Sequence, residues 1–131
     1  MKKRTLCILA IVALFASILL ASATSTGFDT TYPSIGDKTV ATGSRTASTT
    51  DPTFSMALDT TAGDGGEFWM DAYFNGSWVL HSTTFFLSPG DGGNFSYYSS
   101  PLQGTSLRLR TGGSLVNANG GKRLKGSVNF G

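Results

Sequence analysis

The sequence contains little of the chemistry on which catalysis depends. Its single cysteine, Cys7, lies in an apolar N-terminal run, and its single histidine is His81. No His-Glu-x-x-His motif, nucleophile elbow or phosphate-binding loop occurs in the chain. These absences exclude the best-known nucleophilic, zinc-dependent and nucleotide-binding sites. We therefore expect no enzyme activity and no cofactor, and we expect His81 to be structural.

Two carboxylates of one predicted strand, Glu67 and Asp71, are the nearest approach to a hydrolytic pair. Alternation places them on the same face, roughly 13 Å apart at ~3.3 Å per residue. That separation is greater than either glycosidase mechanism uses. A small hydrolase is therefore a remote alternative.

Sustained helical periodicity is missing after residue 23. Short alternating runs are instead separated by turns rich in Gly, Ser and Thr. This pattern predicts an all-β fold, a small antiparallel β-sandwich, over residues 37–131. Residues 24–36 are polar, and we expect them to form a loose lead-in. The inward positions of three predicted strands are apolar: Phe54, Met56 and Leu58; Leu107 and Leu109; Leu124, Gly126, Val128 and Phe130.

The N-terminal 23 residues have the three parts of a signal peptide. Lys2-Lys3-Arg4 is a positive segment, Leu6 to Leu20 is apolar, and Ala21-Ser22-Ala23 has the small side chains of a cleavage site. We expect cleavage before Thr24 and a secreted, extracellular protein. An uncleaved anchor is the alternative, although the apolar run is short for a membrane span.

Charge in the mature chain is nearly balanced. Seven basic and eight acidic residues remain after residue 23, a net charge of about −1. We therefore expect neither nucleic acid as a partner nor stable membrane insertion. Every acid lies at or before Asp91, whereas five of the seven bases lie at or after Arg108. This asymmetry favours ion pairs within the fold, with orientation of a partner as the alternative.

The richest aromatic segment is Gly66 to Ser82. Asn75-Gly76 lies between two apolar runs, and this dipeptide is the strongest short-range signal for a hairpin with a type I′ turn. A two-residue loop fixes the register, so that Tyr73 faces Trp78 and Asp71 faces Leu80. A break or bulge is expected near Ser82 to Thr84.

The register sorts the hairpin side chains into two faces. The first face, interpreted as ordinary core, carries Phe68, Met70, Ala72, Phe74, Val79 and His81. The second face carries Trp69, Asp71, Tyr73, Trp78 and Leu80. It is either buried under other strands or exposed as an aromatic platform for a sugar ring or a partner protein. In the second case the candidate ligand-binding residues are Trp69, Asp71, Tyr73 and Trp78.

Two Gly-rich segments resemble each other at an offset of 27 residues. Gly63-Asp64-Gly65-Gly66-Glu67-Phe68 matches Gly90-Asp91-Gly92-Gly93-Asn94-Phe95. Their acidic and amide side chains are ligands that Ca²⁺ prefers, but each loop offers at most two of them and no calcium-loop pattern is present. We interpret both segments as turns with the same chemistry, and we expect no metal site.

The Lys-Lys-Arg signal, the cysteine-free mature chain rich in Ser, Thr and Gly, and the aromatic strands together resemble small exported β-proteins of Gram-positive bacteria. Some members of that group resemble secreted bacteriocins. Many members of that group have no assigned activity. From the aromatic face of the hairpin we expect a non-catalytic binding or surface-interaction module, directed at cell-wall carbohydrate, another cell-envelope polysaccharide or a protein. The resemblance to bacteriocins implies the alternative, a bacteriocin-like antagonist of other cells.

Overall fold

The computed structural model describes residues 24–48, 50–114 and 117–131. The predicted signal peptide, residues 1–23, lies outside the described residues. Within the described ranges, no helix is long and apolar enough to span a membrane. The strands are β1 (Thr26–Thr31), β2 (Gly36–Ser44), β3 (Thr53–Leu58), β4 (Gly66–Phe74), β5 (Ser77–Leu80), β6 (Phe85–Leu87), β7 (Gly92–Ser96), β8 (Ser106–Ser114) and β9 (Arg123–Asn129).

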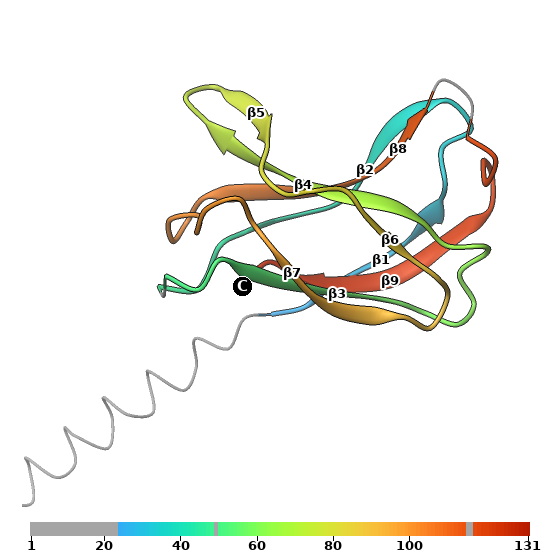
Figure 1. The fold of residues 1–131 in the computed structure, drawn as a ribbon, viewed down its shortest axis with the longest axis horizontal. Coiled ribbons are helices and arrows are strands. Elements are labelled where there is room, and N and C mark those ends of the chain that lie inside the picture. The colour runs from blue at the N-terminus through green and yellow to red at the C-terminus, as the bar shows by residue number, and fades with distance from the viewer. Residues whose placement is uncertain (1–23, 49, 115–116) are drawn as a thin grey trace, which may run out of the picture.

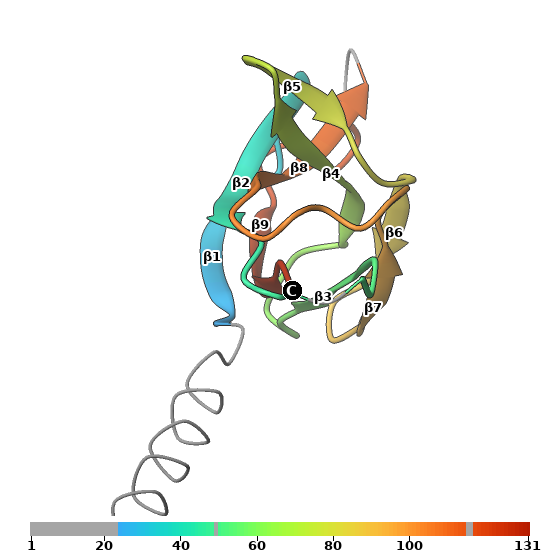
Figure 2. The ribbon, with the colours of Figure 1, turned by 90° about the vertical axis from the view of Figure 1, so that its left-hand side faces the viewer.

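The strands form two antiparallel sheets that pack face to face (Figures 1 and 2). One sheet has the order β1-β9-β3-β7. The other has the order β2-β8-β4-β5, and β6 pairs with β4 beside β5. The predicted all-β antiparallel sandwich is confirmed.

Alternation along the strands builds the core between the sheets. The predicted inward side chains of β3, β8 and β9 are buried, and Leu107, Leu109 and Val128 are completely so; Gly126 is only partly buried. Phe68, Met70 and Ala72 of β4 meet them from the five-stranded sheet and are also fully buried. The core is thus assembled from the faces that the sequence pattern predicts.

The Asn-Gly hairpin forms as expected. Asn75 has φ 49° and Gly76 has φ 84°, the two positive values that a type I′ turn requires. The β4–β5 register pairs Tyr73 with Trp78 and Asp71 with Leu80. The predicted break follows β5, where Ser82 makes an isolated bridge to Tyr97 instead of continuing the strand.

The first hairpin face is core at one end only, which corrects the sequence interpretation. Phe74 and Val79 are exposed, although they share this face with Phe68 and Met70. The reason is that β8 pairs with β4 only as far as Ala72. Residues 73–80 are called the hairpin tip below; the turn end of the hairpin extends past the last β4 residue that pairs with β8, as Figure 1 shows at upper left.

The expected loose lead-in at residues 24–36 is also corrected. Residues 26–31 form β1, which pairs with β9 from Thr26↔Val128 to Thr31↔Arg123. Phe28 and Tyr32 are buried in the core. The segment is polar in composition because only these two side chains face inward, and an edge strand with one buried side leaves little hydrophobic pattern to detect.

The asymmetry of charge is used within the fold, as predicted. Each of the four ion pairs found in the described part of the chain joins an acid that lies before residue 91 to a base at or after Arg108. The pairs are Asp71–Arg108, Asp37–Arg110, Asp64–Lys122 and Asp29–Arg123. The first two cross the outer face of the five-stranded sheet.

The two Gly-rich segments do not form the same turn. Gly65 has positive φ in the first segment, whereas Gly90, which is not its counterpart, has positive φ in the second. A Cβ at Gly65 would lie 2.1 Å from the Leu87 carbonyl oxygen, so close backbone approach also requires glycine there. The likeness between the segments is one of composition, not of conformation.

Candidate binding surface

The hairpin tip places an unusual amount of apolar surface in solvent. Trp78 is 36% exposed and Leu80 52% exposed. The full set of exposed large apolar residues in the tip is Tyr73, Phe74, Trp78, Val79 and Leu80. Single exposed apolar residues are common, but a contiguous group marks an interaction site or an aggregation hazard. Of the two alternatives for the second hairpin face, burial is therefore excluded for Tyr73 and Trp78, because both are exposed.

Trp78 is held in place from two sides. Its ring centroid lies 5.2 Å from that of Tyr73, with 60° between the ring planes. The Arg108 guanidinium lies over the Trp78 ring, 4.5 Å from its centroid. A cation above an aromatic face is an attractive arrangement, and the edge-to-face ring pair adds to it. Trp78 is therefore fixed before any partner arrives.

Asp71 has a supporting position in this arrangement. Its Oδ2 accepts a hydrogen bond from Arg108 Nε at 2.9 Å and forms an ion pair with Nη2 of the same guanidinium, also at 2.9 Å. Asp71 is 7% exposed, so a ligand could reach little of it. The carboxylate instead orients the arginine that covers Trp78.

The structure separates Trp69 from the Tyr73–Trp78 pair. Trp69 is half-buried and lies opposite Arg110 of β8. Arg110 turns toward β2, where Nη1 donates to Thr39 Oγ1 at 2.9 Å and Nη2 pairs with Asp37. Of the four candidate residues, two form one exposed cluster, one supports it, and Trp69 borders a separate hollow.

That hollow, called the Trp69 hollow below, has a volume of about 370 Å³. It is lined by Glu67, Trp69, Leu80, Thr84, Gly112 and Gly113. Gly113 leaves it open, because a Cβ there would lie 3.6 Å from the Trp69 ring; a Cβ at Gly112 would instead lie 2.3 Å from the Gly36 carbonyl oxygen. Positive φ values at both glycines exclude most other residues there.

Arg108 and Phe86 belong to this surface but were not among the predicted site residues. Alternation in β8 did place Arg108 outward, yet the sequence could not tell that β8 would pair with β4 and bring Arg108 to Asp71. Phe86 of β6 is 56% exposed and pairs with Glu67 of β4. Its outward position follows from the register of a three-residue strand, which no local pattern fixes.

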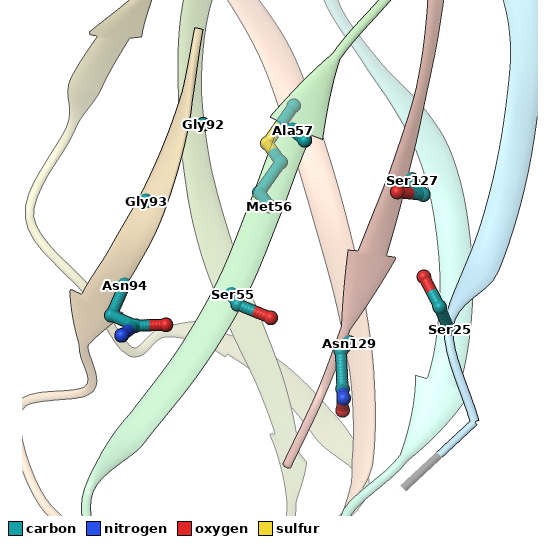
Figure 3. A pocket seen from close by; sticks show the side chains of 9 residues that line it. All are labelled: Ser25, Ser55, Met56, Ala57, Gly92, Gly93, Asn94, Ser127 and Asn129. Atoms are coloured by element: carbon teal, nitrogen blue, oxygen red, sulfur yellow. The ribbon is translucent and has the colours of Figure 1, made fainter.

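The outer face of the four-stranded sheet is different in character. A shallow hollow of about 320 Å³ lies across β1, β9, β3 and β7 (Figure 3). Its lining is Ser25, Ser55, Met56, Ala57, Gly92, Gly93, Asn94, Ser127 and Asn129. It contains no aromatic or charged side chain, so it offers hydrogen bonds but little surface that gains from leaving water.

The remaining candidates for chemistry are structural or dispersed. His81 is buried, its Nε2 lies 3.0 Å from the Ser99 carbonyl oxygen, and its ring contacts Phe74 and Tyr97. Asp64 pairs with Lys122. No group of three or more His, Cys, Asp or Glu side chains gathers as a metal site within the described residues.

A scan against protein-family models and a search of curated proteins each find no match. Among solved structures, the chain is similar to the Yersinia pseudotuberculosis-derived mitogen, with a TM-score of 0.51 and 12% identity over 83% of this chain and 87% of that one. It is also similar to PirA, with a TM-score of 0.44 and 12% identity over 82% and 93% of the two chains. A third is the EclA C-terminal domain, a sugar-binding protein, with a TM-score of 0.45 and 10% identity over 82% and 79%. At this identity, the likeness to the mitogen shows a shared fold alone.

Proposed function

We propose that this protein is an exported, non-catalytic binding module that docks a protein partner through its hairpin tip. The observation that carries the proposal is the group of exposed aromatic and aliphatic side chains on a hairpin that extends beyond the sandwich. Trp, Tyr and Arg are the residues that dominate the energetics of protein interfaces. Here Trp78, Tyr73 and Arg108 lie in contact.

Preorganisation supports the same function. The chain of contacts from Asp71 through Arg108 to Trp78 fixes the indole without a ligand. Binding then costs less side-chain entropy, because the anchor does not have to be ordered on association. If Trp78 had only a structural role, we would expect it in the core, as Phe68 and Met70 are.

A protein partner fits the geometry better than a polysaccharide does. Stacking on a sugar ring uses an open, flat aromatic face. One face of Trp78 is already covered by Arg108, and Tyr73 meets Trp78 at 60° and not in the same plane. The tip also exposes Phe74 and Val79 on its other side. Burying both sides requires a groove, which a folded protein provides.

A photo-crosslinking side chain at Ser77, within the tip, tests the proposal. With the secreted protein in its own extracellular medium, we expect a crosslink to a defined polypeptide that Trp78→Ala abolishes. Leu102→Ala is the matched control, because Leu102 is 79% exposed but lies outside the tip. A crosslinker at Ser127, on the four-stranded sheet, should give no such product.

Three outcomes would contradict docking of a protein partner through the tip. Equal crosslinking by Trp78→Ala and the unchanged chain would remove the tip from the interface. Retention on insoluble cell wall or polysaccharide, lost in Trp78→Ala, would reassign the surface to a glycan. Inhibition of other cells by the purified protein without any polypeptide partner would favour the bacteriocin-like alternative. Export is tested separately: N-terminal sequencing of the secreted form should begin at Thr24.

A further inference from the structure

One carboxylate on the outer face of the five-stranded sheet is left without a basic partner. Arg108 is paired with Asp71 and Arg110 with Asp37. Glu67 is exposed, and none of the four ion pairs in the described part of the chain includes it. This face therefore carries one uncompensated negative charge, at a known position.

Glu67 lies beside apolar surface on two sides. It lines the Trp69 hollow together with Leu80. It also lines a neighbouring hollow of about 300 Å³, where Phe86 and Tyr32 are the aromatic members. The carboxylate thus has an aromatic side chain near it in each hollow.

We propose that the Trp69 hollow receives a basic side chain, lysine or arginine, of the protein partner. This inference rests on the proposed docking function and extends it to the charge of the partner. Lysine and arginine carry a long apolar stem with a charged end. In the hollow the stem packs against Trp69 and Leu80, and the charged end reaches Glu67.

The size and the openness of the hollow fit this occupant. Its volume of about 370 Å³ is at the low end of the range for ligand sites, which suits one side chain better than a folded element. The absence of a side chain at Gly113 keeps the space beside the Trp69 ring clear. The hollow adjoins the hairpin tip through Leu80, so one partner can occupy both.

Small model compounds test the charge preference on the full secreted chain. The probes are the N-acetyl methylamides of lysine, arginine and norleucine, and norleucine supplies a similar stem without charge. Binding is followed by the NMR shift of the Trp69 indole N–H. We expect the basic probes to bind about fivefold more tightly than norleucine, the size of effect typical of one partly exposed ion pair. Added salt should reduce the difference.

Glu67→Gln should make the three probes bind equally, without a change in melting temperature because the side chain is exposed. Asp91→Asn is the matched control: it removes one exposed charge outside this face and should leave the preference intact. Equal binding of norleucine by the unchanged chain, or a preference that survives Glu67→Gln, would overturn the inference.

The crosslinking assay separates this inference from the docking function. If Trp78→Ala abolishes the crosslink and Glu67→Gln leaves it at full strength, the hollow does not bind a basic side chain of the partner. Docking through the tip is still supported in that case. If both variants retain the crosslink, docking through the tip itself fails. Loss of the crosslink in both variants, together with a preference for the basic probes, supports both the docking function and the basic side chain in the hollow.

Discussion

The base and the tip of the β4–β5 hairpin share one sequence pattern and have opposite environments. At the base, Phe68 and Met70 are completely buried. At the tip, Phe74 continues the same alternation and is exposed. The difference arises outside the hairpin, because β8 pairs with β4 no further than Ala72.

The comparison shows how a strand can serve two purposes. Where a second sheet covers it, its apolar face stabilises the fold in proportion to the area removed from water. Beyond the end of the neighbouring strand, the same residue types contribute little stability and remain available to a partner. The hollow on the outer face of the four-stranded sheet is lined mainly by Ser, Asn and Gly instead.

The largest expected effect separates base from tip directly. Phe68→Ala should lower the free energy of unfolding by about 3–5 kcal/mol, because it leaves a cavity in the core. Phe74→Ala on the same face should cost less than about 1 kcal/mol, since Phe74 is 37% exposed and its removal leaves no enclosed cavity. Chemical denaturation of both variants measures the difference. Similar losses would mean that the tip is packed as tightly as the base.

The turn that forms the tip is the next test. Gly76→Val should destabilise the fold by about 1–3 kcal/mol, because Gly76 has φ 84°. No atom lies within 4 Å of a Cβ at this position, so the cost would come from backbone strain and not from a clash. Ser77→Val, one residue along the tip, is the control, and thermal melting should show a much smaller change. A Gly76→Val melt equal to the control would refute the type I′ turn.

Tyr97 is buried and its ring contacts His81, which follows β5. Its burial predicts an effect of pH on stability. Burial raises the pKa of Tyr97 well above its usual value near 10, with Arg45 acting in the opposite direction. The folded state therefore favours the neutral phenol, while the unfolded chain ionises first. Stability from this residue is complete below about pH 10 and is lost as the pH rises further.

Tyr97→Phe should make the alkaline loss of stability less steep. At neutral pH the variant should lose about 1 kcal/mol, the contribution of one hydrogen bond, here from Tyr97 Oη to the Phe130 carbonyl oxygen at 2.9 Å. That oxygen keeps a second donor, Arg45 Nη1 at 3.1 Å, so it is not left unpaired. Unfolding curves at pH 7 and above pH 10 provide the measurement. An unchanged alkaline slope would show that Tyr97 ionises as readily in the folded state.

Local patterns predicted the hairpin, and non-local pairing decided its environment. Asn75-Gly76 fixed the turn and the register because a type I′ turn allows few alternatives. The length of β8 alongside β4 depends on contacts between segments far apart in the sequence. This is why the exposure of Phe74, the contact of Arg108 with Asp71 and the strand at residues 26–31 were not predictable from local alternation.

The paired measurement of stability and docking on Trp78→Ala tests the central claim most directly. We predict a loss of about 1 kcal/mol, the scale of an exposed cation–π contact, and therefore a fall of several degrees in melting temperature. The crosslink from Ser77 to the partner should disappear in the same variant. A fall in stability as large as that of Phe68→Ala, with the crosslink retained in the folded fraction, would contradict the claim, because Trp78 would then belong to the core.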